Sequence, residues 1–216
     1  MDGKCILIGA GDLTVGELSV AAKDLVIAVD GGLGYCGVLE IEPDVILGDF
    51  DSLTEGERQA LDGLREQIPE RIITLPVEKD ETDMLAAIKY GLAKAYRDFR
   101  IYGGTGGRVD HTLANIQCLL YLKKQDAVGY LIDGDGMMFV IQDEAIHLKA
   151  GLEGTLSLFC MGETAEGVTI EHMKYPLRDA RMTNDFPIGI SNEFIGEEAV
   201  ISVRKGALVC IIRYAE

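Results

Sequence analysis

The feature that most constrains the fold is a regular alternation of apolar, strand-like segments with helical patterns over the first two-thirds of the chain. The strand-like segments are short, rich in branched residues and bounded by Gly, Pro or Asp; they cover residues 4–11, 25–32, 44–50, 71–77, 99–104 and 128–134. Between them, apolar residues recur at helical spacing, most clearly over residues 82–96 and 109–124. This alternation predicts a parallel sheet covered on both faces, which binds ligands beyond the C-terminal ends of its strands.

The pattern changes at about Asp133, beyond which short strands follow one another without helices. These strands are separated by turn residues and cover residues 136–142, 144–150, 154–161, 167–172, 198–204 and 207–215. Such a run predicts a small all-β sandwich or barrel. We therefore predict an α/β protein with two domains, a Rossmann-like parallel-sheet domain over residues 1–134 and a small all-β sandwich over residues 135–216.

The charge balance limits the ligands that this chain is expected to bind. It has 36 acidic and 20 basic residues, with a formal net charge of −16. This excess argues against nucleic acid and against an anionic membrane as partners, because both are bound through cationic side chains. A phosphate-bearing ligand would need a divalent cation to mediate much of its contact with the protein.

Three further observations favour a cytoplasmic location. No apolar run approaches the roughly 18 residues needed to cross a membrane. The apolar stretch at the N-terminus is too short and too quickly followed by glycine to be a secretion signal. Five scattered cysteines show no metal-ligand spacing, which indicates reduced thiols.

Two carboxylates, Asp49 and Asp51, close the strand-like run at residues 44–50. If both residues are still extended, their side chains leave the same face and repel each other unless a cation lies between them. A hard divalent ion such as Mg²⁺, which retains waters and substrate phosphates, suits this pair. The structural alternative is that Asp51 only begins a turn and that Thr54 caps the next helix with Glu57 as its capping-box partner.

A second polar cluster covers residues 78–83. Asp80 or Thr82 is suited to cap the helix that follows, and Asp83 lies in its first turn, where the helix dipole favours a negative charge. A helix N-terminus also binds phosphate. Lys79 and Asp80, together with Asp83, would then place a cation and two potential metal ligands at the same edge of the sheet.

A third cluster is the glycine-rich stretch at residues 103–107, followed by Arg108, Asp110 and His111. Four glycines around Thr105 allow backbone N–H groups to approach an anion closely, and the guanidinium of Arg108 suits phosphate oxygens. The stretch is not a Walker loop, because no Gly-Lys-Ser/Thr follows. The structural alternative for His111 is a polar residue near the start of a helix.

Three shorter motifs carry weaker signals. The sequence GAGDLT at residues 9–14 lacks the third glycine of a dinucleotide-binding fingerprint. Asp30 and Gly31 follow another strand, and Ser191 and Asn192 lie in the β half; each pair also fits a simple turn. Taken together, the carboxylates and the glycine-rich loop follow successive strands of one parallel sheet, so we expect them to converge on Mg²⁺ and a polyphosphate.

These motifs together resemble the thiamine pyrophosphokinase family. The matching elements, in the family's order, are DGG at 30–32, PDVILGDFDS at 43–52, KDETD at 79–83, GGTGGRVDHTLAN at 103–115, KYPL at 174–177 and GISNE at 189–193. The resemblance implies a homodimer in which an α/β nucleotide domain precedes a β-sandwich. It also implies transfer of a diphosphate from ATP to the hydroxyl of thiamine, giving thiamine diphosphate and AMP.

The resemblance also assigns roles to individual residues. It implies that Asp49, Asp51 and Asp83 are catalytic and hold Mg²⁺, with the proton acceptor left open between Asp51 and Asp83. The residues expected to bind ATP are Asp30, Gly31, Lys79, Asp80, Thr82, Gly104, Thr105, Gly106, Gly107, Arg108, Asp110 and His111. Ser191 and Asn192 would line a thiamine pocket that faces the partner subunit's nucleotide site. Some members stack thiamine on a tryptophan in the final strand, and this chain has no Trp.

Three other functions are weighed against this one. A related pyrophosphokinase would act on another alcohol, such as a hydroxymethyl pterin. A sensor would bind ATP or thiamine diphosphate without turnover. A phosphatase would use an aspartate nucleophile in DFDSL at residues 49–53. The phosphatase signature, however, usually lies on the first strand and has Thr or Val after its second Asp. In this chain the motif lies on about the third strand, and Ser52 follows.

Overall fold

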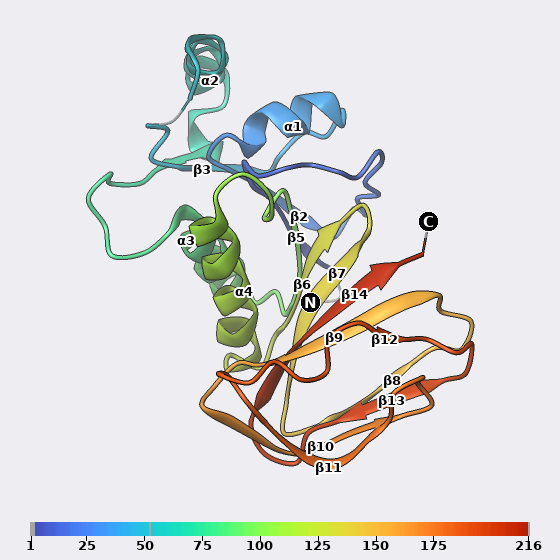
Figure 1. Cartoon of the computed structure of the whole chain (residues 1–216). Coiled ribbons are helices and arrows are strands. Elements are labelled where there is room, and N and C mark those ends of the chain that lie inside the picture. Colours follow the sequence, from blue (N-terminus) through green and yellow to red (C-terminus); the bar gives the residue numbers. More distant parts are fainter. Residues whose placement is uncertain (1–2, 52, 216) are drawn as a thin grey trace. The chain divides into compact units, whose positions relative to one another are not determined.

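The computed structural model describes residues 3–51 and 53–215, which form two compact units (Figure 1). The first unit comprises the described residues up to Cys118 together with Asp126–Gly134. The second comprises Leu119–Gln125 and the described residues from Asp135 onward. Ser52, the last residue of the motif at residues 43–52, lies outside the described part of the chain.

The first unit is built on a parallel sheet, as its apolar strands predict. Its strands are β1 (Cys5–Ile8), β2 (Leu25–Val29), β3 (Val45–Gly48), β4 (Ile72–Thr74), β5 (Asp98–Tyr102) and β6 (Val128–Asp133). They lie in the order β6-β5-β1-β2-β3-β4, and every pairing between them is parallel. The four residues of β1 and the four residues of β3 are all buried, which is why these segments are continuously apolar.

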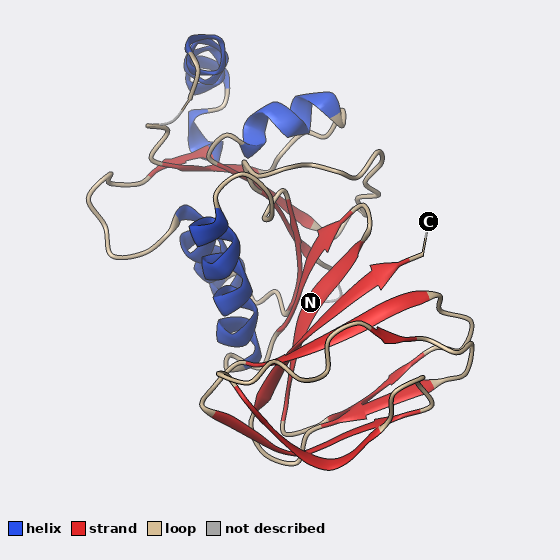
Figure 2. Cartoon of the chain, viewed as in Figure 1, coloured by secondary structure: helices blue, strands red, loops and turns tan. Residues whose placement is uncertain are grey.

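Helices cover both faces of this sheet (Figure 2). They are α1 (Gly32–Val38), α2 (Glu55–Gln67), α3 (Asp83–Ala93) and α4 (Val109–Lys123), with a short 3-10 turn, η1 (Pro69–Arg71), before β4. On one face, Ile6 and Ile8 of β1 pack in a cluster with Cys36 of α1 and Leu61 of α2. On the other face, α3 approaches so closely that a Cβ atom at Gly91 would lie 2.7 Å from the Cys5 Sγ. The prediction that both faces of the parallel sheet are covered is therefore confirmed.

The order of the strands places a switch point between β1 and β5. The chain moves from β1 through β2 and β3 to β4, and then returns to form β5 and β6 on the opposite side of β1. The loops that follow β1 and β5 therefore lead to strands on opposite sides of this pair. In open parallel sheets, the crevice at such a point is where ligands bind.

The second unit contains the predicted all-β part together with the end of α4 (Val109–Lys123). It contains two antiparallel sheets, with strand orders β12-β9-β14-β7 and β11-β10-β13-β8. The strands are β7 (Gly136–Gln142), β8 (Ala145–Leu148), β9 (Gly154–Cys160), β10 (Thr164–Glu171), β11 (Leu177–Thr183), β12 (Asn192–Glu193), β13 (Ala199–Ser202) and β14 (Ala207–Tyr214). Buried side chains such as Leu158 and Cys210 of one sheet, and Val168 and Ile201 of the other, supply its core.

Two strands of this unit were not expected from the sequence. Strand β11 has the sequence LRDARMT, with three charged residues among its seven, and its burial alternates poorly because it lies at the edge of its sheet. Strand β12 has two residues and is also an edge strand. Among the described residues, no helix is long and apolar enough to cross a membrane.

Candidate active site

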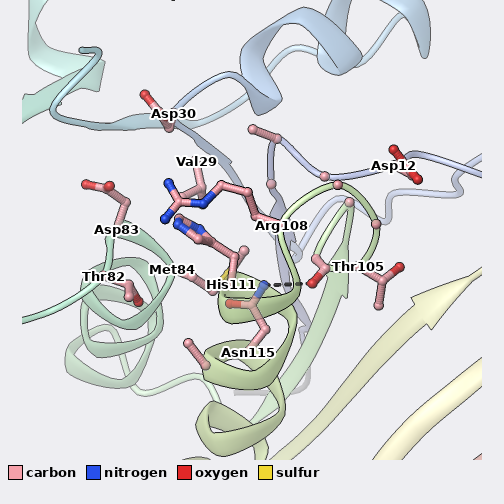
Figure 3. A pocket seen from close by; sticks show the side chains of 18 of the residues that line it. Asp12, Val29, Asp30, Thr82, Asp83, Met84, Thr105, Arg108, His111 and Asn115 are labelled. Carbon is pink, nitrogen blue, oxygen red and sulfur yellow. Dashed lines mark hydrogen bonds between the residues drawn. The ribbon is translucent and has the colours of Figure 1, made fainter. Parts of the chain in front are cut away.

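A pocket of about 460 Å³ lies in the first unit, at the switch point between β1 and β5 (Figure 3). Its walls come from the ends of β2 and β5, the loops after β1, β4 and β5, and the first turns of α3 and α4. The lining residues include Gly9, Ala10, Gly11, Asp12, Asp30, Lys79, Thr82, Asp83, Gly103, Gly104, Thr105, Gly106, Gly107, Arg108, His111 and Asn115. The pocket thus contains most of the residues that the sequence assigns to ATP binding.

Two glycine-containing loops form one side of the pocket. Gly11 N donates to Gly103 O at 2.7 Å, and Asp12 N donates to Thr105 O at 2.7 Å. The backbones are so close that a Cβ atom at Gly103, whose φ is +58°, would lie 2.5 Å from Gly9 O. A residue with a side chain would force these loops apart, and so the glycines are needed for this arrangement.

The glycine-rich loop is also fixed from below by α4. Asn115 is buried, and its Nδ2 donates to Gly104 O at 2.7 Å (Figure 3). Beyond this anchor, Gly106 and Gly107 are exposed and have φ values of +81° and +59°. Their backbone is therefore rigidly supported on one side and open on the other, which suits an anion-binding loop.

Arg108 and His111 extend from the start of α4 over the middle of the pocket, with Asp30 and Asp83 on the other wall (Figure 3). The guanidinium of Arg108 forms a two-pronged pair with Asp110, Nη2 to Oδ2 at 2.6 Å and Nε to Oδ1 at 3.2 Å. The hydrogen bond from Arg108 lowers the pKa of Asp110 to about 2. Asp110 does not line the pocket and instead holds Arg108 in position. Both residues are expected to bind ATP, but of the two only Arg108 lines the pocket.

The carboxylates after β3 and at the start of α3 meet at one ammonium group. Lys79 Nζ lies 2.5 Å from Asp49 Oδ2 and 3.2 Å from Asp83 Oδ1. The side chains of Lys79, Asp49 and Asp83 are 14%, 11% and 22% exposed. The strand-end rule therefore correctly predicts that these three residues converge, although Asp49 contacts Lys79 from outside the set of residues that line the pocket.

Burial and mutual repulsion affect these acids differently. Burial raises the pKa of Asp83, the contact with Lys79 opposes this, and the charges of Asp49 and Asp30 add to the increase. Burial also acts to raise the pKa of Asp49, but hydrogen bonds from Lys79 and from the Asp51 backbone outweigh it, so the pKa of Asp49 is below its ordinary value. Asp83 therefore interacts with two other acids, and Lys79 pairs with Asp83 and with one of these, Asp49.

The Asp49–Asp51 segment differs from its expected geometry. Strand β3 ends at Gly48, and Phe50 has a φ of 60°, so Asp49 and Asp51 do not lie on one extended strand. The ring of Phe50 is buried in the core, which turns the chain and leaves Asp51 exposed. Asp51 N donates to Asp49 Oδ1 at 3.3 Å, as in an Asx turn. Within the described residues, no cluster of three or more His, Cys, Asp or Glu side chains is arranged to hold a metal ion.

The capping predictions are confirmed. Thr54 and Glu57 form a complete capping box at the start of α2. Thr82, rather than Asp80, caps α3 by accepting from Leu85 N at 3.2 Å. Asp80 is exposed, and neither it nor Gly31 lines the pocket.

In the second unit, Ser191 and Asn192 have different environments. Asn192 is buried; its Oδ1 accepts from Tyr175 N at 2.9 Å, and its Nδ2 donates to Tyr175 O at 2.8 Å. Ser191 is exposed, has a φ of 54° and donates its backbone N–H to Ser157 Oγ at 3.0 Å. Asn192 therefore holds the KYPL segment in place, while Ser191 presents its side chain at the surface.

Sequence reasoning missed the loop at residues 9–12. GAGD is an incomplete dinucleotide-binding fingerprint, yet all four of its residues line the pocket. The signal that could have found them is the strand-end rule itself, because β1 is a parallel strand of the same sheet.

Comparisons with known proteins find the same family for both parts of the chain. A family model described as the catalytic domain of thiamin pyrophosphokinase matches residues 17–131, and a model described as its vitamin B1 binding domain matches residues 143–208. A thiamine pyrophosphokinase of Bacillus subtilis (strain 168) is 34% identical over 190 residues, covering 86% of this chain and 85% of the relative.

Solved structures show the same similarity. The crystal structure of thiamine pyrophosphokinase from Bacillus subtilis superposes with a TM-score of 0.87 at 30% identity and covers 100% of both chains. A thiamin pyrophosphokinase from Geobacillus thermodenitrificans gives a TM-score of 0.82 at 26% identity, covering 99% of this chain and 98% of the other. Since the match to the catalytic-domain model alone spans more than half of the sequence, the chain belongs to the thiamin pyrophosphokinase family.

Proposed function

We propose that this protein is an enzyme that transfers the β,γ-diphosphate of ATP to the hydroxyl of thiamine, giving thiamine diphosphate and AMP. The observation that carries the proposal is the pocket at the switch point of the parallel sheet, whose lining residues, apart from those at 9–12, lie in the part of the chain that matches the catalytic-domain model. A related enzyme acting on a hydroxymethyl pterin is not favoured, because the matching models and relatives name thiamine.

The pocket is suited to a polyphosphate. Backbone N–H groups of the loop at residues 103–107 and the guanidinium of Arg108 offer donors and positive charge on one wall. Thr82 places the N-terminus of α3 at the same pocket, which adds the positive end of a helix dipole. Asp30 and Asp83 on the opposite wall would repel a bare triphosphate, so a cation is needed between them.

Mg²⁺ suits the chemistry of the carboxylates at this edge of the sheet, of which Asp83 lines the pocket. Asp83 Oδ1 is buried, and its contact with Lys79 has the geometry of an ion pair without that of a hydrogen bond. Hard carboxylate oxygens are the protein ligands that Mg²⁺ prefers. We assign Asp49, Asp51 and Asp83 as the residues that would hold it. When bound, the ion would supply charge neutralisation on the phosphate oxygens and on the departing AMP.

The reaction that we assign to this site is an in-line displacement. The hydroxyl oxygen of thiamine forms a bond to the β-phosphorus, the bond from that phosphorus to the bridging oxygen of AMP breaks, and the hydroxyl proton passes to a base. Asp51 and Asp83 are the candidates for that base at this edge. The residues of the pocket would mainly position the reactants and neutralise developing charge, which is how most of the rate enhancement arises in such reactions.

We place thiamine at the loop that contains Ser191 and Asn192, and we expect this loop to face the nucleotide site of the partner subunit in a homodimer. Support comes from the match of residues 143–208 to a vitamin B1 binding domain. Asn192 fixes the backbone of Tyr175, whose side chain is 57% exposed and offers an aromatic ring beside this loop. A cytoplasmic location is also our proposal, and the five free cysteines support it.

The test is product analysis. Purified protein is incubated with ATP, MgCl₂ and thiamine, and AMP and thiamine diphosphate are separated by chromatography. We expect the two products to form in equal amounts and AMP to require thiamine. Replacing thiamine with a hydroxymethyl pterin serves as the control for acceptor identity. Release of ADP, or tight nucleotide binding without any AMP, would refute the proposal.

A further inference from the structure

Lys79 occupies an unusual position for a residue expected to bind phosphate. Its ammonium group lies between Asp49 Oδ2, at 2.5 Å, and Asp83 Oδ1, at 3.2 Å, and donates to Pro76 O at 3.1 Å. Its side chain is only 14% exposed. In this arrangement the lysine is committed to carboxylates and to the backbone.

The ammonium group joins two separate segments of the sheet edge. Asp49 directly follows β3, and Asp83 is the first residue of α3. Two carboxylates that are both largely buried and close together repel each other unless a positive charge lies between them. Lys79 therefore supplies the charge that allows these acids to converge in the protein alone.

The same two acids are among the three that we assign to Mg²⁺. An ammonium group and a divalent ion cannot both lie between the same oxygens, because they repel each other and compete for the same lone pairs. Lys79 also lines the pocket with the loop at residues 103–107. Its flexible four-carbon chain would let the released ammonium group reach a phosphate without leaving the pocket.

We propose that Lys79 is a positioning residue that acts as the resident counter-cation of Asp49 and Asp83 and yields these acids to the divalent ion when the magnesium–nucleotide complex binds. The ammonium group then pairs with the phosphates. This inference rests on the proposed function, because it assumes that a magnesium–nucleotide complex is the ligand of the pocket.

The principal test is Lys79→Met, with binding of Mg²⁺ or Mn²⁺ measured in the absence of nucleotide by calorimetry or by electron paramagnetic resonance. Removing the competing ammonium group should tighten metal binding by about tenfold, the effect of one neighbouring charge on such a site. The melting temperature of Lys79→Met should fall in EDTA and recover when MgCl₂ is added, whereas that of the wild type should change little.

Lys89→Met is the matched control. Lys89 lies on α3, has 47% of its side chain exposed and pairs with Glu81, which lines the pocket but is not one of the assigned metal ligands. This substitution also removes a lysine from an ion pair, but not from between the assigned metal ligands. Its metal affinity and its response to EDTA should equal those of the wild type. If Lys79 had only a structural role, Lys79→Met would lower the melting temperature without making it depend on metal.

A second measurement applies even if Lys79→Met does not fold. Lysines of the wild type are labelled by reductive ¹³C-methylation, and the Lys79 signal is identified by its loss in Lys79→Arg. The signal should move when MgCl₂ and ATP are added together. An unmoved signal, or metal affinity in Lys79→Met no tighter than in the wild type, would overturn the inference. If either of these contrary results is found while the wild-type protein still forms AMP from ATP and thiamine, the inference about Lys79 is wrong but the proposed function stands.

Discussion

The hydrogen bond between Asn115 and the glycine-rich loop gives a prediction that separates stability from substrate binding. Asn115 Nδ2 donates to Gly104 O at 2.7 Å, and both residues are buried. Asn115→Leu keeps a side chain of similar size but removes this donor. A buried carbonyl that loses its donor costs about 1–3 kcal/mol of free energy of unfolding. For a chain of this length, that corresponds to a decrease in melting temperature of about 2–12 °C.

The same bond sets the position of the backbone N–H groups that we assign to the phosphates. Because a displacement of about 1 Å can cost about 10²-fold in rate, we expect kcat/KM for ATP to fall by about 10- to 100-fold in Asn115→Leu. The KM for thiamine should change little, since the thiamine loop is assigned to the other unit. Initial rates of AMP formation, measured with each substrate varied in turn, give both values.

Gln117→Leu provides the control, because Gln117 is exposed on the same helix two residues away. It should match the wild type in melting temperature and in kcat/KM. If Asn115→Leu lowers the melting temperature but leaves kcat/KM for ATP unchanged, the bond is structural only and the loop does not depend on it. If neither quantity changes, the argument from buried hydrogen bonding is wrong at this site.

Three further substitutions test other parts of the argument. Asp49→Asn should lower kcat by about 10²–10³-fold while circular dichroism shows an intact fold; a fully active variant would exclude Asp49 from the metal site. Glu57→Gln keeps a side chain that can form the capping box but removes the negative charge from the first turn of α2, so it should cost about 0.3–1 kcal/mol at pH 7. Hydrogen bonds from the Thr54 side chain and backbone hold the pKa of Glu57 below its ordinary 4.5, so this difference from wild type should persist above pH 4.5 and shrink as the pH falls further. Urea denaturation at several pH values measures it, and a constant difference would refute the assignment. Asn192→Leu should lower the free energy of unfolding by about 2–4 kcal/mol through the loss of two bonds to Tyr175. It should also raise the KM for thiamine more than that for ATP; equal effects on both would contradict its placement.

The fold class could be predicted because the apolar residues of the sequence follow two patterns, one typical of buried parallel strands and one typical of helices. Buried parallel strands such as β1 and β3 are continuously apolar, and α3 carries apolar residues at helical spacing. The position of the pocket could be predicted from a different rule, which is that side chains following parallel strands meet at one edge of the sheet. The prediction failed at β11 and β12, because an edge strand needs little apolar pattern and two residues carry none.

The orientation of the acids could not be predicted from local sequence. Whether Asp49 and Asp51 share a face depends on Phe50, which adopts a φ of 60° while its ring packs into a core formed by distant segments. That choice is made by tertiary packing, and a pattern of residue types does not contain it. The partnership of Lys79 with two acids likewise depends on where three loops meet.

At Thr82, the structural explanation (helix capping) and the functional explanation (ligand binding) are compatible with each other. Thr82 caps α3 and also lines the pocket. The residues that begin α3 must satisfy its exposed N–H groups, and the same positive end attracts phosphate, so a good cap and a good anion site favour the same position. A capping role for a residue at this sheet edge is therefore no evidence against a role in binding. Asp83 in this turn and Asp49 after β3 are tolerated for a different reason, since Lys79 neutralises them until, as we infer, a metal ion replaces it.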